Sequence, residues 1–80
     1  MYIVKTAAAK MPSSCKGRYR RVAVMEVADG TEPAMISERA KGVIRIVETW
    51  ERLNEGRTDK CAYRRALAEA NAMAERLNAA

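Results

Sequence analysis

Two stretches near the start of the chain have the short, β-branched pattern of strands. Residues 1–9 and 18–27 are rich in β-branched and aromatic side chains, and the polar segment KMPSSCKG between them contains a proline and a glycine, which interrupt regular structure. We therefore expect residues 1–27 to form an antiparallel β-hairpin. The sequence ADGTEP at residues 28–33 has the composition of a turn that leads the chain out of the hairpin.

Alternation in the second strand divides its side chains between two faces of the sheet. One face is expected to carry Arg18, Arg20, Val22, Val24 and Glu26. The other is expected to carry Tyr19, Arg21, Ala23, Met25 and Val27. Because neither face is wholly apolar, we expect the arginine-rich end to extend beyond the core while the VAVMEV end is covered.

The pattern in residues 36–55 allows two interpretations. The segment VIRIVETW has the composition of a strand, but an alternating strand would mix charged with apolar side chains on both faces. At about 100° per residue, the apolar side chains instead fall within an arc of about 180°, as in a helix with one buried face. These side chains are Ile36, Ala40, Val43, Ile44, Ile46, Val47, Trp50 and Leu53. We therefore predict a helix, with Ser37 as its N-cap and Gly56 just after its end.

The last segment has the three-four apolar spacing of an amphipathic helix, with Thr58 as a cap. We predict a helix over residues 59–78, joined to the preceding helix by a loop short enough to force an antiparallel helical hairpin. The predicted fold is α+β: an N-terminal antiparallel β-hairpin followed by a helical hairpin, in one domain of residues 1–80. Its predicted core consists of Val22, Val24, Val43, Val47, Trp50, Leu53, Leu67, Ala70 and Met73.

Composition adds a positive charge and a limit on size. The 80 residues carry 15 Lys plus Arg against 10 Asp plus Glu, which gives a formal net charge of +5. A chain of this length forms one small domain with a thin core, so a second copy, as in a homodimer, is a candidate partner. No stretch reaches the roughly 18 apolar residues of a membrane span, and we expect a soluble protein of the cytoplasm.

Most catalytic and metal chemistry lacks its residues in this chain. There is no His and there are only two Cys, so the common zinc patterns and His-dependent nucleophiles are excluded. We expect Cys15 and Cys61 to be free thiols in a reducing compartment, with Cys61 serving as a small packing residue. The sequence therefore predicts a protein that is not an enzyme, holds no metal and needs no cofactor.

Two basic clusters are candidate binding sites for an anion. The first is formed by Lys10, Lys16, Arg18, Tyr19, Arg20 and Arg21. Guanidinium groups bind phosphate or carboxylate bidentately, and an interleaved tyrosine can stack on a base; protection of an exposed strand edge by charge is the alternative reading. The second is formed by Arg57, Lys60, Arg64 and Arg65. It lies at a helix N-terminus, which favours anions, and a simply solvated polar face is its alternative.

This profile, a single basic domain rich in Ala and Arg with no catalytic residues, resembles the small phage-encoded inhibitors of bacterial immunity, notably the anti-CRISPR proteins. The resemblance implies a non-enzymatic protein that occupies a surface on a bacterial defence complex in the host cytoplasm and blocks its recognition of nucleic acid. A basic inhibitor would meet an acidic protein surface or nucleic acid there. The alternative is a protein that binds DNA or RNA directly with little sequence preference.

Overall fold

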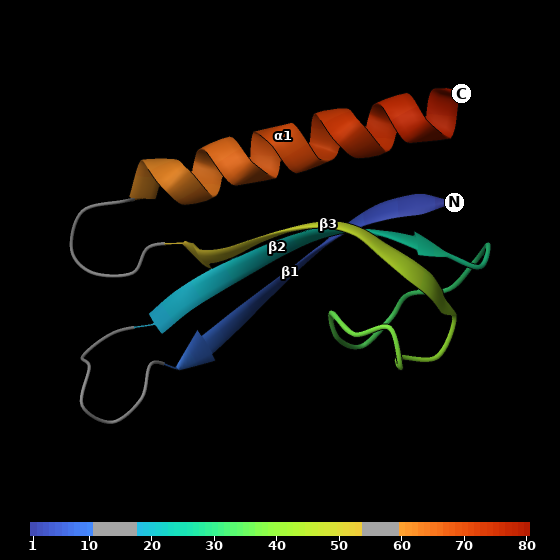
Figure 1. The fold of residues 1–80 in the computed structure, drawn as a ribbon, viewed down its shortest axis with the longest axis horizontal. Coiled ribbons are helices and arrows are strands. Elements are labelled where there is room, and N and C mark those ends of the chain that lie inside the picture. Colours follow the sequence, from blue (N-terminus) through green and yellow to red (C-terminus); the bar gives the residue numbers. More distant parts are fainter. Residues whose placement is uncertain (11–17, 54–59) are drawn as a thin grey trace.

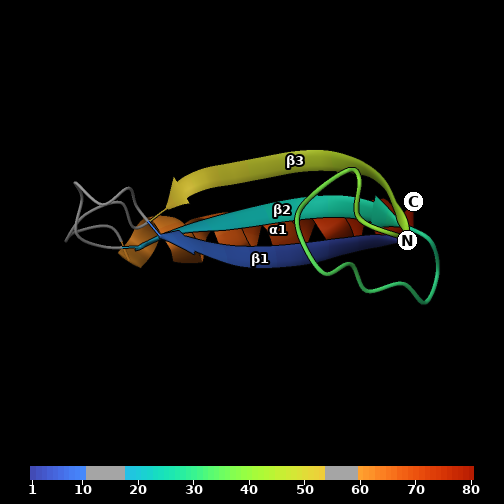
Figure 2. The same ribbon diagram turned by 90° about the horizontal axis from the view of Figure 1, so that it is seen from below.

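The computed structural model describes residues 1–10, 18–53 and 60–80. Its elements are β1 (Tyr2–Lys10), β2 (Arg18–Val27), β3 (Val43–Leu53) and α1 (Lys60–Ala79). The strands form one antiparallel sheet in the order β1-β2-β3, and α1 packs on one face of this sheet (Figure 1; Figure 2). The α+β class, the β-hairpin and the C-terminal helix are confirmed.

The helix predicted over residues 36–55 is wrong, and with it the helical hairpin. Residues 43–53 form the third strand, which pairs antiparallel with β2. In the described pairing, three register shifts occur along β3. Each shift places one extra residue of β3 opposite β2, as a β-bulge does.

The bulges explain why this strand has the apolar spacing of a helix. Each extra residue interrupts the two-residue alternation, so side chains on one face are separated by three positions instead of two. Val43 and Ile46 both pack on the face away from α1, whereas Val47 and Trp50 both pack towards α1. A spacing of three within each pair imitates a helical turn, although the backbone is extended.

Apolar side chains are buried on both sides of β2, the central strand. Towards α1, the buried cluster consists of Val22, Val24, Ala66, Ala70 and Ala74. On the opposite face it consists of Ala23, Met25, Val27 and Ile36. The alternation predicted for β2 is therefore confirmed, and both faces of its C-terminal half are covered.

The predicted core is largely confirmed. Val22, Val24 and Ala70 are buried beneath α1. Partly buried side chains pack against them, among them Val47, Trp50, Leu67 and Met73. Val43 instead packs on the opposite face, and the side chain of Leu53 lies outside the described residues.

The segment between β2 and β3 covers the face of the sheet that α1 leaves open. It begins with a turn in which the Thr31 amide donates to the carbonyl of Ala28 at 3.0 Å, so the turn predicted from ADGTEP is confirmed. The chain then passes beneath the sheet, opposite α1 (Figure 1), and buries Pro33 and Ile36. The result is a layered molecule of helix, sheet and loop.

Candidate functional site

Two basic segments that are far apart in the sequence meet at one end of the molecule. β1 ends at Lys10 and β2 begins at Arg18, and these two residues lie opposite each other. They are at the same end of the long axis as the start of α1 (Figure 1). The Arg20 guanidinium lies 4.7 Å from the centre of the Tyr63 ring, which joins β2 to α1. We call this region the basic end, and its described members are Lys10, Arg18, Arg20, Arg21, Lys60, Arg64 and Arg65.

Arg20 lies on the side of the sheet that faces α1. Its guanidinium stacks over Tyr63, an arrangement worth about 0.5–1 kcal/mol at an exposed site. The residue as a whole is exposed. The ring therefore orients the cation without removing it from solvent, and Arg20 stays open to an anionic partner.

Arg21 points to the opposite face and has an acidic neighbour. Its Nε donates to Oε1 of Glu51 at 3.0 Å, and its Nη2 lies 2.7 Å from the same oxygen. A surface pair of this kind contributes little to stability, about 0–1 kcal/mol, but it offsets the charge of Arg21. Consecutive arginines of the first predicted cluster are thus split between two faces of the sheet.

The structure describes the other predicted site residues to different extents. Arg64 and Arg65 are exposed on the first turns of α1. For Lys10, Arg18, Tyr19 and Lys60 the backbone positions are described, at the ends of their strands and at the start of the helix. Lys16 and Arg57 lie outside the described residues.

The opposite end of the molecule carries charges of both signs that pair with one another. Arg45 Nε donates to Oε1 of Glu26 at 3.0 Å, and this hydrogen bond is the main reason why the pKa of Arg45 is raised above its ordinary value. The amino group of Met1 lies 3.5 Å from the Asp29 carboxylate. Positive charge is therefore concentrated at the basic end.

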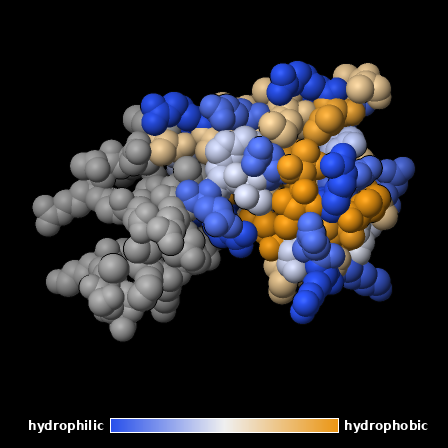
Figure 3. Space-filling model, viewed as in Figure 1, coloured by the Kyte–Doolittle hydropathy of each residue, from blue (hydrophilic) through white to orange (hydrophobic). Residues whose placement is uncertain are grey.

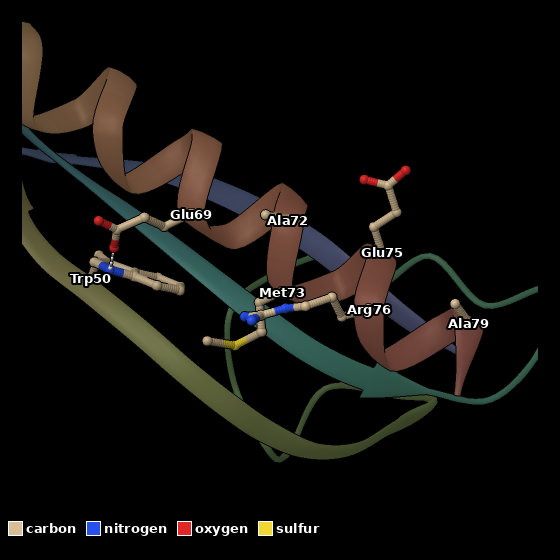
Figure 4. A pocket seen from close by; sticks show the side chains of 7 residues that line it. All are labelled: Trp50, Glu69, Ala72, Met73, Glu75, Arg76 and Ala79. Carbon is tan, nitrogen blue, oxygen red and sulfur yellow. Dashed lines mark hydrogen bonds between the residues drawn. The ribbon is translucent and has the colours of Figure 1, made fainter.

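A groove of about 620 Å³ lies between α1 and β3. Trp50 and Met73 provide its apolar surface, and Nε1 of Trp50 donates to Oε2 of Glu69 at 3.2 Å (Figure 4). Arg76 borders the groove, whereas Glu75 points away from Trp50. An apolar area is visible on this side of the molecule (Figure 3).

This groove does not follow from the sequence analysis, which places Trp50 in the core of a helical hairpin. The groove exists because α1 lies mainly over β1 and β2 and contacts β3 less. A helix about 10 Å across covers only about two strands spaced about 4.8 Å apart. With residues 43–53 taken as a strand, this geometry would have predicted an uncovered third strand.

Metal-binding side chains do not cluster in the described part of the chain. Among residues 1–10, 18–53 and 60–80, no three His, Cys, Asp or Glu side chains come together as a metal site requires. Within the part of the chain that the structure describes, no helix is long and apolar enough to span a membrane. Chemically, the basic end brings cationic residues together, and Arg20 among them is held over the Tyr63 ring.

No family model, curated protein or solved structure matches this chain.

Proposed function

We propose that this is a non-enzymatic binding protein whose basic end binds the phosphate backbone of DNA or RNA. The observation that carries the proposal is the meeting of the two basic segments at the Arg20–Tyr63 contact. Basic residues of β1, β2 and α1 then lie at one end of the molecule, and clustered Lys and Arg side chains release counterions when they contact phosphates.

The charge distribution supports a polyanionic partner. Acidic and basic groups pair at the opposite end, as in the Arg45–Glu26 bridge, so the net charge of +5 is not spread evenly. The chain also contains no His, the side chain most often used for proton transfer near neutral pH. A protein that binds its partner through charge and catalyses no reaction would have both features.

The test is binding of labelled duplex DNA, single-stranded DNA and RNA of mixed sequence, followed by fluorescence anisotropy over a range of salt. We expect affinity to fall steeply with salt, with a log–log slope of about −0.9 per phosphate contacted on duplex and about −0.7 on single strands. Replacing Lys10, Arg18 and Arg20 together by Gln should reduce the size of this slope by about two to three.

A control variant separates the basic end from net charge alone. Replacing Arg39, Lys41 and Arg76 by Gln removes the same charge from positions outside the basic end, and we expect a much smaller loss of affinity. Circular dichroism of both variants checks the fold. Equal losses in the two variants, or no binding by the unmodified protein at low salt, would contradict the proposal.

Exposed apolar side chains favour a second candidate, an anti-CRISPR-type inhibitor that acts on a bacterial protein complex. Ile44 on β3 is 61% exposed and Met35 is 59% exposed, and a protein partner would remove this apolar surface from water. An acidic patch on such a complex would meet the basic end. Stoichiometric capture of a defence complex by the protein, with weak binding to free DNA and RNA, would favour this candidate over the first.

A further inference from the structure

The outer edge of β1 offers peptide groups to a further strand. Met1 and Val27 exchange two backbone hydrogen bonds, of 2.8 Å from the Val27 amide and 2.9 Å from the Met1 nitrogen. In an antiparallel pair, residues that bond their neighbour alternate with residues that point away. The peptide groups of Tyr2, Val4, Thr6 and Ala8 therefore point away from β2, towards the open edge of the sheet.

Asn78 confirms this orientation at the first position. Its side-chain Oδ1 accepts from the Tyr2 amide at 2.8 Å, and its Nδ2 donates to the Tyr2 carbonyl at 2.8 Å. The amide of Asn78 thus bonds Tyr2 in the way that the peptide group of a neighbouring strand would. Beyond it, the edge continues from Val4 to Ala8.

The two edges of the sheet differ in their ability to accept a strand. β3 carries three register shifts, and bulges disrupt the regular row of donors and acceptors that an added strand needs. β1 pairs with β2 in unbroken register from Tyr2 to Lys10. Its edge is regular and is flanked by small or short side chains at Thr6 and Ala7.

We propose that a second copy of this chain pairs with the β1 edge, antiparallel about Thr6, to make a continuous six-stranded sheet. With Thr6 opposite Thr6 of the second copy, Val4 faces Ala8, and Lys5 faces Ala7. The register shifted by two, centred on Lys5, would put two lysines directly opposite each other, which is unfavourable. Threonine pairs across strands are favourable, so the first register is preferred.

The position of α1 fits this arrangement. Because α1 lies mainly over β1 and β2, we place its axis midway between these two strands. Neighbouring strands are about 4.8 Å apart, so the axis lies about 2.4 Å from β1 on the side towards β2. Two-fold symmetry about Thr6 then places the two α1 helices on the same face with their axes about 10 Å apart. Packed helices are separated by about 8–10 Å, so the two helices would be in contact.

Charge on α1 is complementary across the same axis. α1 runs antiparallel to β1 (Figure 1), and Asn78 contacts Tyr2. Thr6 lies about 14 Å further along β1, which corresponds to about nine helical residues before Asn78, near Glu69 and Ala70. Arg64 and Glu75 lie at equal distances on either side of that point, so each Arg64 meets Glu75 of the second copy.

Side-chain directions agree with this pairing. By helical periodicity, Arg64 and Glu75 lie on the same side of α1 as Asn78, which contacts β1. Glu69 lies on the other side and bonds Trp50 of β3. Both Arg64 and Glu75 are exposed, and Glu75 points away from the groove (Figure 4). The proposed dimer does not require the basic end to bind nucleic acid, but Arg64 belongs to both surfaces.

The first experiment measures mass against concentration by sedimentation equilibrium, from about 10 μM to 1 mM, where weak interfaces associate. The unmodified protein should approach twice its 8.9 kDa. Thr6→Pro removes an amide that points outward and is tolerated on an edge strand, so this variant should fold and stay monomeric. Ala7→Pro is the control, because its amide faces β2 and its loss should unfold the chain.

The second experiment reverses charges on α1, and it tests the proposed dimer even if Thr6→Pro fails to fold. Glu75→Arg alone and Arg64→Glu alone should each weaken dimerisation about five- to tenfold, since each change acts twice by symmetry. The double variant restores the pairing and should return to within about threefold of the unmodified protein. Arg76→Glu, on the groove side of α1, should leave dimerisation unchanged.

Three results would overturn the proposal. A protein that remains monomeric up to 1 mM has no such interface. A dimer that persists in folded Thr6→Pro, or in which the double variant fails to restore association, uses another surface. Dimerisation that is lost in Arg76→Glu would place the contact at the groove between α1 and β3.

Discussion

Gly42, just before β3, shows how one residue fixes the path of the chain. Its φ is +85°, in the left-handed region that favours glycine, and a Cβ at this position would overlap Cγ2 of Thr31. Gly30 also has a positive φ, of 78°, but a Cβ there would meet no atom within 4 Å. Comparing substitutions at the two glycines therefore distinguishes the cost of backbone strain from the cost of steric overlap.

We predict that Gly42→Ala destabilises the protein at least twice as much as Gly30→Ala. The Gly30 change should cost about 1–2 kcal/mol from left-handed strain alone, whereas the Gly42 change adds the overlap with Thr31. Urea unfolding at low protein concentration measures both. Adding Thr31→Gly to Gly42→Ala should recover part of the loss, and equal costs for the two alanine variants would show that the close approach to Thr31 is unimportant.

At the scale of elements, the contact between α1 and the sheet depends on small side chains. Ala66, Ala70 and Ala74 form the buried stripe of α1, and they pack against Val22 and Val24 of β2. A stripe of alanines lets the helix axis approach the sheet closely. Larger side chains at the same positions would hold the two layers apart.

Ala70→Leu should therefore destabilise the protein by about 1–3 kcal/mol, because Ala70 is fully buried and the added atoms overpack the interface. Ala72→Leu is the matched change on the exposed side of α1 and should alter stability by only about 0.5 kcal/mol. Thermal unfolding of both variants makes the comparison. If Ala70→Leu is as stable as the unmodified protein, the alanine stripe is not closely packed.

At the scale of the whole molecule, the first strand and the last helix are held together directly. Asn78 makes two hydrogen bonds of 2.8 Å with the peptide groups of Tyr2, across a sequence separation of 76 residues. This contact closes the end opposite the basic end. α1 lies mainly over β1 and β2, which leaves the groove beside β3.

Asn78→Asp should cost about 1–2 kcal/mol, because a carboxylate cannot donate to the Tyr2 carbonyl and places negative charge at a helix C-terminus. Asn71→Asp, an exposed position within the same helix, should cost about 0.5 kcal/mol or less. Chemical denaturation of both variants provides the measurement. Similar costs would mean that charge on α1, and not the bond to Tyr2, is responsible.

The sequence by itself determined the elements whose signals are local. β1, β2 and the turn after β2 follow from β-branched runs bounded by turn residues, and α1 follows from its three-four apolar spacing. The two basic clusters were equally visible, because charge is a property of composition. In each case the deciding interaction lies within a few residues along the chain.

Only the tertiary structure decided the state of residues 43–53 and the shape of the basic end. The apolar spacing of β3 fits a helix as well as a bulged strand, and its bulges exist only in register with β2. Likewise, Arg20 meets Tyr63 while Arg21 pairs with Glu51, contacts between residues at least 30 positions apart. Pairing between distant segments has no periodicity of its own, so the sequence alone could not specify it.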